Sequence, residues 1–337
     1  MLTVYSPAHA GHAPEFELHR GAMVPCFERP SRAENVLAAV RAAGHEVVGP
    51  AASGMDAVQA AHGAGYLAFL RTAHGRWRAG GRQGDAVPHA WPDRRGVVPD
   101  CLLGQLGYYV NDAGTPITAG TWDALSAGAD CVQTAVDALA DRPAAFALTR
   151  PPGHHAAASL GAGYCLVNFA AVAAETMLAG GSRRVAILDV DYHHGNGTQA
   201  IFEGRGDVLF ASIHADPHAA YPYFSGHGEE RGVGLGEGAT LNLPLPDGTA
   251  WPAYGRALET ALTAVADFGA ERLVLSLGLD AYKDDPISTF ALETADFARV
   301  GRAVTGLGVP TCVVLEGGYH LPSVGANAAA ALTGWNR

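Results

Sequence analysis

Residues 185–197 read VAILDVDYHHGNG, and this segment indicates both a type of sheet and the place of a site. Its first part, Val185–Leu188, is an apolar run without polar alternation, as in strands that are buried on both faces. Ionisable residues follow at alternate positions: Asp189, Asp191 and His193. Residues two apart on a strand project from the same face. We therefore expect a buried strand whose carboxyl end carries a row of ionisable side chains.

Similar aliphatic runs recur along the chain, and Ala-rich stretches with helical spacing separate them. Strands that alternate with helices are typical of a parallel sheet with helices on both faces. The sequence therefore predicts one α/β domain over residues 1–337. The predicted strands are Leu2–Tyr5, Ala145–Leu148, Val185–Leu188, Val208–Ile213, Leu273–Leu277 and Cys312–Leu315, and the predicted helices are Ala33–Ala43, Trp122–Leu139, Phe169–Leu178, Trp251–Phe268 and Phe297–Leu307.

Residues 80–120 interrupt this alternation, because they show little periodicity. Long irregular loops are uncommon unless they are functional or disordered. Aromatic and aliphatic residues such as Trp91, Leu102 and Tyr108 argue against disorder. We expect an ordered excursion that either covers a pocket or contacts a second subunit.

The composition, 48% hydrophobic and 16% charged residues, is ordinary for a soluble globular protein. No apolar run reaches the roughly 18 residues that cross a bilayer, and Met1–Ala10 lacks the pattern of a secretory signal, so we expect a cytoplasmic protein without a membrane partner. The five cysteines are scattered and never spaced as CxxC, which argues for free thiols. A net charge of −11 without a basic stretch argues against nucleic-acid binding.

The carboxyl ends of the predicted strands carry candidate metal ligands, at the edge where open parallel sheets bind their ligands. Asp191 and His193 follow one strand, and Asp280 follows Leu273–Leu277. Three protein ligands and one open position are typical of a catalytic Zn²⁺ site. We predict one Zn²⁺ per chain, with Fe²⁺ as the alternative, because oxygen-rich ligation accepts either ion. The competing interpretation is a structural cluster of ion pairs.

Two adjacent histidines, His154 and His155, follow the predicted strand Ala145–Leu148. Neighbouring residues in an extended chain point apart, so both cannot easily bind one ion. Two imidazoles near a metal-bound water indicate a general base and a general acid. Asp189 and Asn196 are candidates for orienting them. A histidine that faces Asp stays biased towards its charged form, whereas one that faces Asn can exchange its proton near neutral pH.

Tyr319 follows Glu316-Gly317-Gly318 at the end of a fourth strand. A phenol opposite the metal would donate a hydrogen bond to a developing oxyanion. The sequence contains no G-x-S-x-G motif and no G-x-G-x-x-G or GK[ST] motif. It therefore gives no support to a serine hydrolase or to a phosphate-binding loop.

These motifs occur together in an order that resembles one known family. PPGHH, GYC, LDVDYHHGNGTQ, ASIH, SLGLD and EGGY are similar to the motifs of the histone deacetylase superfamily, especially its bacterial acetylpolyamine amidohydrolase branch. The resemblance extends from Val4 to about Leu332. It implies the arginase–deacetylase fold and a zinc-dependent hydrolase that releases acetate from small N-acetylated amines, such as acetylpolyamines or acetyl-lysine-like substrates.

The resemblance also implies roles for single residues. His155 would be the general base that later protonates the leaving amine, His154 its electrostatic companion, and Tyr319 the group that polarises the carbonyl. Asn196 stands where class I deacetylases have aspartate, which places the chain nearer class II. The implied zinc ligands are Asp191, His193 and Asp280; the implied structural potassium site is Asp189 and Ser212 with the backbone carbonyls of Asp191, His193 and Ile213; and the implied substrate-binding residues are Glu17, Gly163, Tyr164 and Tyr221.

The resemblance has departures and leaves alternatives open. It implies a homodimer through residues 80–120, but acidic residues expected there for polyamine binding are replaced by Leu103 and Gly114, with Asp100 and Asp112 nearby. A protein or peptide lysine deacetylase is one alternative. An arginase-like ureohydrolase is another, although Tyr282 stands where a ligand for a second metal would be needed. The remaining alternative is a non-catalytic homologue that binds a small molecule.

Overall fold

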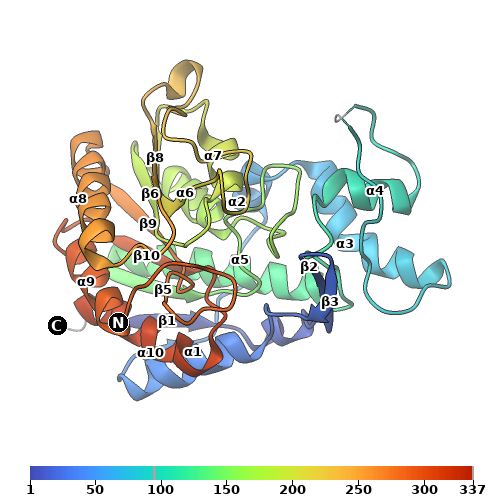
Figure 1. Cartoon of the computed structure of the whole chain (residues 1–337), viewed down its shortest axis with the longest axis horizontal. Helices are drawn as coiled ribbons and strands as arrows, with labels where there is room; N and C mark the ends of the chain where they lie inside the picture. The colour runs from blue at the N-terminus through green and yellow to red at the C-terminus, as the bar shows by residue number, and fades with distance from the viewer. Residues whose placement is uncertain (94–95, 336–337) are drawn as a thin grey trace.

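A computed structural model describes residues 1–93 and 96–335; two residues of the predicted excursion and the last two residues of the predicted domain lie outside the described residues. The core of the protein is an eight-stranded sheet in the order β4-β1-β5-β10-β9-β6-β7-β8 (Figure 1). Every neighbouring pair in it is parallel. The strands are β1 (Leu2–Tyr5), β4 (Glu46–Val48), β5 (Ala144–Leu148), β6 (Val185–Asp189), β7 (Val208–Ala215), β8 (Thr240–Leu245), β9 (Arg272–Leu277) and β10 (Thr311–Leu315).

The predicted parallel sheet is confirmed, and each of the six predicted strands is present within two residues of its expected bounds. The two strands that the sequence did not predict, β4 and β8, lie at the edges of the sheet. Both are partly exposed, and β8 contains Pro244. Edge strands bury less apolar surface and tolerate proline, so they lack the continuous aliphatic pattern that identifies the inner strands.

Helices cover both faces of the sheet, as predicted, and each face has its own apolar core. Alternate residues of β6 belong to different cores: Val185 and Ile187 face one layer, and Ala186 and Leu188 face the other. Figure 1 shows one helical layer gathered along one side of the strands. That layer contains α1 (Ser31–Ala42), α8 (Trp251–Phe268), α9 (Thr294–Thr305) and α10 (Leu321–Leu332), and the other contains α2 (Asp56–Ala61), α3 (Ala64–Ala79), α4 (Leu102–Tyr109), α5 (Thr121–Asp137) and α6 (Phe169–Ala179).

The excursion at residues 80–120 contains α4, which packs against α3. Trp91 Nε1 donates a hydrogen bond to the carbonyl of Val110 at 2.9 Å. Ala86 and Ile117 exchange two backbone hydrogen bonds of 2.9 and 3.0 Å. These contacts fold the described part of the excursion back onto the domain and bring its second half towards the carboxyl edge of the sheet.

A second, two-stranded sheet lies outside the main one. It is the antiparallel hairpin of β2 (Phe16–His19) and β3 (Ala22–Pro25). Its tip is Arg20-Gly21, and both residues have a positive φ, 48° and 82°. The remaining short helix, α7 (Asn196–Phe202), follows β6. Within the described ranges, no helix combines the length and apolarity that a membrane span requires.

Candidate active site

Four neighbouring strands end at one place, and the residues that follow them form the candidate site. In the sheet, β5, β10, β9 and β6 are consecutive, so the segments after them converge at the carboxyl edge. The segment after β5 carries His154 and His155, and the segment after β10 carries Tyr319. The segments after β6 and β9 carry Asp191, His193 and Asp280.

The three predicted metal ligands form one buried cluster. One ligand atom from each of Asp191, His193 and Asp280 lies within 4.8 Å of the others. His193 Nδ1 is 3.2 Å from Asp191 Oδ1 and 3.0 Å from Asp280 Oδ2. Backbone amides hold the other carboxylate oxygens, since Gly317 N donates to Asp191 Oδ2 at 2.8 Å and Tyr192 N donates to Asp280 Oδ1 at 2.9 Å. These hydrogen bonds orient both carboxylates in the cluster.

The charges and chemistry of this cluster fit a divalent cation. Two fully buried carboxylates face one imidazole, and buried negative charges are costly unless a cation compensates them. Burial and the neighbouring Asp191 raise the pKa of Asp280 to about 6. Two carboxylates and one imidazole are also ordinary ligands of Zn²⁺. Glycine is required at position 317, because a Cβ there would lie 2.5 Å from Asp280 Oδ2 and 2.6 Å from Asp191 Oδ2.

His154 and His155 have different hydrogen-bond partners, and their pKa values are shifted in opposite directions. His154 Nδ1 lies 2.9 Å from Asp189 Oδ2; burial opposes its charge, but the carboxylates of Asp189 and Asp191 outweigh burial and raise its pKa to about 10. His155 Nδ1 lies 2.7 Å from Asn196 Oδ1. Burial and the charge of His154 lower the pKa of His155 well below its usual value. The protein thus holds a cationic imidazole and a neutral one side by side, with ring centroids 4.0 Å apart.

Glu316 fixes the loop that carries both histidines, and the sequence analysis did not assign it a role. Its Oε2 accepts hydrogen bonds from Gly153 N at 2.6 Å and from His154 N at 3.1 Å. Ser276 Oγ donates to its Oε1 at 3.2 Å. Burial raises the pKa of Glu316 to about 7. Its position directly after the apolar run Cys312–Leu315 was the signal that this carboxylate is needed at the site.

The backbone around Tyr319 is held from two sides. Asp285 Oδ2 accepts a hydrogen bond from Tyr319 N at 2.7 Å. On the other side, the buried Arg32 donates to the carbonyls of Gly318 and Glu316, both at 2.6 Å, and its guanidinium lies 4.6 Å from the centre of the Tyr319 ring. Tyr319 is thus held in place by two residues that lie far from it in the chain. Because of that distance, no sequence motif assigned this role to Asp285 or Arg32.

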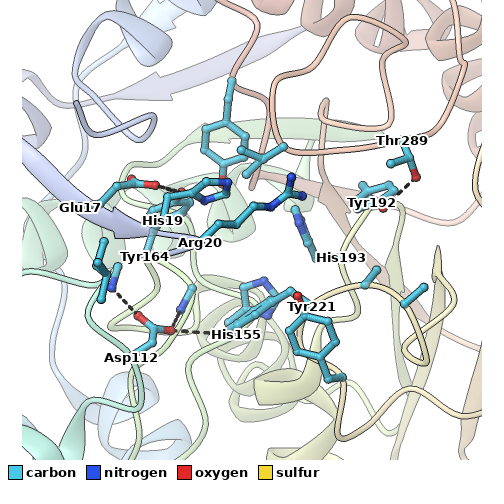
Figure 2. A pocket seen from close by; sticks show the side chains of 18 of the residues that line it. Glu17, His19, Arg20, Asp112, His155, Tyr164, Tyr192, His193, Tyr221 and Thr289 are labelled. Carbon is cyan, nitrogen blue, oxygen red and sulfur yellow. Dashed lines mark hydrogen bonds and ion pairs between the residues drawn. The ribbon is translucent and has the colours of Figure 1, made fainter. Parts of the chain in front are cut away.

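A pocket of about 490 Å³ opens above these groups (Figure 2). His155, His193 and Tyr319 form part of its lining, so the pocket reaches the metal cluster. The four residues that the resemblance implied as substrate contacts also line it: Glu17, Gly163, Tyr164 and Tyr221. The structure therefore brings two of the predicted catalytic residues, His155 and Tyr319, and the predicted substrate contacts to one cavity, whereas His154 lies behind His155 outside the lining.

Asp112, from the excursion, ties the pocket wall together. Its Oδ2 accepts hydrogen bonds from Gly163 N at 2.7 Å and from the Tyr221 hydroxyl at 3.2 Å. The Tyr221 ring stands edge-on to His155, with centroids 5.0 Å apart. On the opposite wall, the Tyr164 hydroxyl donates to Glu17 Oε1 at 2.8 Å. The aromatic walls are thus fixed by two carboxylates, the half-buried Asp112 and the buried Glu17, rather than by packing alone.

Leu103 and Gly114, which stand where acidic residues for polyamine binding were expected, have different surroundings. Leu103 packs against the apolar core, whereas Gly114 lines the pocket and brings no charge to it. Asp100 is exposed. Asp112 lines the pocket, but donors of the protein already occupy its carboxylate. Neither nearby aspartate is therefore a free acidic group in the pocket.

The implied potassium residues lie at the end of β6 and along β7. Asp189 stands in register with Ser212, whose hydroxyl is 2.8 Å from His214 Nδ1. Asp189 Oδ1 accepts a hydrogen bond from Asp191 N at 3.1 Å. The carboxylate of Asp189 therefore connects this set both to the metal cluster and to His154.

Comparison with known proteins agrees with this geometry. The chain matches the family model described as histone deacetylase domain over residues 26–335. It is 48% identical to acetylpolyamine amidohydrolase 1 of Pseudomonas aeruginosa, over 99% of each chain, and 48% identical to the acetylpolyamine amidohydrolase of Mycoplana ramosa, over 99% of each chain. The crystal structure of acetylpolyamine aminohydrolase from Burkholderia pseudomallei superposes with a TM-score of 0.96 at 39% identity, covering 100% of this chain and 98% of that one. The protein belongs to the histone deacetylase family and is a hydrolase of amide bonds.

Proposed function

We propose that the protein is a zinc-dependent deacetylase that releases acetate from small N-acetylated amines, the class that includes acetylpolyamines and acetyl-lysine-like molecules. The observation that carries this proposal is the convergence of Asp191, His193 and Asp280 on a single buried point at the base of a pocket that His155 and Tyr319 also line. The printed names of the relatives, which specify acetylpolyamines, support the substrate class.

His155 is the proposed general base. Because its Nδ1 faces the amide oxygen of Asn196, the ring proton of the neutral form sits on Nδ1 and the lone pair on Nε2. Nε2 takes a proton from the attacking water and later gives it to the amine nitrogen as the amide C–N bond breaks. A bound Zn²⁺ would supply a Lewis acid for the carbonyl and for the water. The products are acetate and the free amine.

Tyr319 and His154 stabilise the charges that develop during this reaction. Burial raises the pKa of Tyr319 well above its usual value, so its hydroxyl keeps its proton and donates to the carbonyl oxygen as that oxygen becomes negative. His154 stays protonated against Asp189. Its positive charge disfavours protonation of His155 before the reaction and favours the anionic transition state.

Further parts of the proposal concern ions, assembly and location. Fe²⁺ is the alternative to Zn²⁺, and K⁺ bound by Asp189, Ser212 and neighbouring backbone carbonyls would compensate the buried charge of Asp189. A homodimer through residues 80–120 is supported by apolar side chains exposed there, since Val97 is 93% and Trp91 44% exposed. The free cysteines are compatible with a cytoplasmic location.

The proposed function is tested by acetate release from a panel of N-acetylated polyamines, acetyl-lysine peptides and acylated aryl amines, with zinc-loaded protein. His155→Ala should abolish turnover. His218→Ala, which changes an exposed histidine outside the pocket lining, is the matched control and should retain it. Zinc-loaded protein that folds but releases acetate from none of these compounds would refute the proposal. Hydrolysis of a guanidino compound with two Mn²⁺ per chain would favour the ureohydrolase instead.

A further inference from the structure

We infer that Asp247 binds the free ammonium group of an acylated polyamine, and that this contact lets the enzyme distinguish such amines from neutral acylated alkylamines. The inference rests on the proposed deacetylase function and assigns part of its substrate recognition to one side chain. It comes from the charges of the pocket, whose lining includes the carboxylates of Glu17, Asp112 and Asp247. All three attract a cationic substrate, but they differ in how well an ammonium group can reach them.

Asp247 is the accessible carboxylate of the three. Glu17 is buried and accepts one protein hydrogen bond at each oxygen. Asp112 is half-buried and accepts two at each oxygen. Asp247 is exposed, and its Oδ1 accepts from the Thr289 hydroxyl at 2.6 Å. In the described part of the chain no donor is found for its Oδ2, so this oxygen is available to a ligand.

Hydrogen bonds hold the Asp247 carboxylate at a fixed place relative to the metal cluster. The Thr289 hydroxyl, which donates to Asp247, also lies 3.0 Å from the Tyr192 hydroxyl. Because a threonine hydroxyl has one hydrogen, Tyr192 is the donor of this second bond. The Tyr192 ring stands edge-on to the ring of His193, with centroids 4.8 Å apart. Figure 2 shows Tyr192 and Thr289 on the side of the pocket away from Glu17.

The turn that carries Asp247 is attached to the segment that contains Thr289. Gly248 N donates to the carbonyl of Thr289 at 3.0 Å, and Ala291 N donates to the carbonyl of Thr249 at 2.8 Å. Aspartate is common in turns because its side chain often accepts a hydrogen bond from the backbone of its own turn. The Asp247 side chain instead accepts from Thr289, outside the turn. Turn chemistry therefore does not explain the position of this carboxylate.

An acylated polyamine has the charge and shape that this arrangement requires. With its acyl group at the metal cluster, it presents its ammonium group at the mouth of the pocket. Ile287 and Tyr223 also line the pocket and offer apolar surface to its methylene chain. Ammonium and carboxylate form charge-assisted hydrogen bonds, whereas a neutral alkyl end gains none. Arg20 belongs to the lining as well, but it is exposed at the hairpin tip, where solvent screens its charge.

Three acetylated probes of similar chain length, which differ in the charge at the far end, test this inference. They are N-acetylputrescine, which ends in an ammonium group, N-pentylacetamide, which is neutral, and δ-acetamidovalerate, which ends in a carboxylate. For the zinc-loaded wild type, we expect kcat/KM to be about tenfold higher for N-acetylputrescine than for N-pentylacetamide, and lowest for δ-acetamidovalerate. The difference should lie mainly in KM, because the ammonium group is far from the reacting bond. Added salt should reduce it.

The variants assign the preference to Asp247. Asp247→Asn keeps the shape of the side chain and should lower the ratio of N-acetylputrescine to N-pentylacetamide about fivefold, the upper range for an ion pair at an exposed site. Asp247→Glu keeps the charge and should retain a higher ratio than Asp247→Asn, and Asp247→Lys should bring the ratio below one. Asp267→Asn makes the same change at an exposed position on α8 outside the pocket lining and should leave the ratio unchanged. Zinc content and melting temperature are measured for each protein.

The outcomes separate this inference from the proposed function. A wild-type ratio near one, or a ratio that Asp247→Asn leaves unchanged, would overturn the inference while the deacetylase function stands. An equal loss in Asp267→Asn would do the same, as would hydrolysis of acylated aryl amines without hydrolysis of the three probes. Failure of the zinc-loaded protein on every acylated amine would overturn the proposed function, and the inference with it.

Discussion

Replacing Asn196 with aspartate tests how the protein keeps His155 neutral beside a cationic neighbour. The site contains its own comparison: His154, 2.9 Å from the carboxylate of Asp189, has a pKa of about 10, while His155, 2.7 Å from the amide of Asn196, has a pKa well below its usual value. A carboxylate next to an ionisable group shifts its pKa by about 1–3 units. We expect Asn196→Asp to raise the pKa of His155 by about 2 units, equivalent to about 2.7 kcal/mol.

The sign of the effect on catalysis follows from the role of His155 as a base. A higher pKa leaves less of the neutral form at a given pH, so the acidic limb of the kcat/KM profile should move to higher pH by about 2 units. On that limb the rate at fixed pH should fall by up to about 10²-fold, and it should recover above the new pKa.

The assay is kcat/KM for one acetylated amine across the pH range, with zinc content and melting temperature measured for each protein. Asn35→Asp makes the same chemical change at an exposed position on α1 and should leave the profile unmoved. An Asn196→Asp protein that is folded and zinc-loaded, yet has an unshifted acidic limb, would show that His155 is not the group that accepts the proton.

Three other predictions follow from the site. Tyr319→Phe should lower kcat by about 10²–10³-fold with little change in KM, as for one oxyanion donor; full activity in acetate release would remove Tyr319 from the mechanism. Asp285→Asn weakens the acceptor of the Tyr319 and His320 amides and should lower kcat and reduce the free energy of unfolding by about 1–3 kcal/mol; kinetics and denaturant stability equal to the wild type would contradict it. Chelation should abolish turnover and lower the melting temperature, and Zn²⁺ should restore both; an identical melting curve with and without chelator would argue against a structural contribution of the ion.

The sequence was sufficient to predict the inner strands of the sheet, because strands that are buried on both faces lack polar alternation. Val185–Asp189 and Arg272–Leu277 are recognisable for that reason. The edge strand β8 alternates between buried and partly exposed residues and has no such pattern. The hairpin β2–β3 contains exposed Phe16 and Met23, so neither its pattern nor its turn residue Arg20 indicated two paired strands.

In the candidate site, sequence motifs predicted the residues that directly follow strand ends. The roles of the other site residues depend on tertiary contacts. Arg32 lies on α1, 286 residues from the Gly318 carbonyl that it contacts, and an arginine on a helix normally indicates a solvated face. Asp112 was considered only as a substitute acid for polyamine binding, whereas it holds Gly163 and Tyr221 in the pocket wall. Such roles depend on distances that no local pattern encodes.

The strand order also has a consequence for the folding of the newly synthesised chain. The first part of the chain forms one side of the sheet, β4-β1-β5, and the middle part forms the other side, β6-β7-β8. The last two strands to be synthesised, β9 and β10, lie between these two sides. His154 and His155 follow β5 on the first side, and Asp191 and His193 follow β6 on the second. A chain emerging from the ribosome thus has the two histidines and two of the three candidate metal ligands before it has the central strands, and Asp280 and Tyr319 follow only with β9 and β10. Catalytic competence therefore requires that the segment from Arg272 onward inserts into the centre of the sheet.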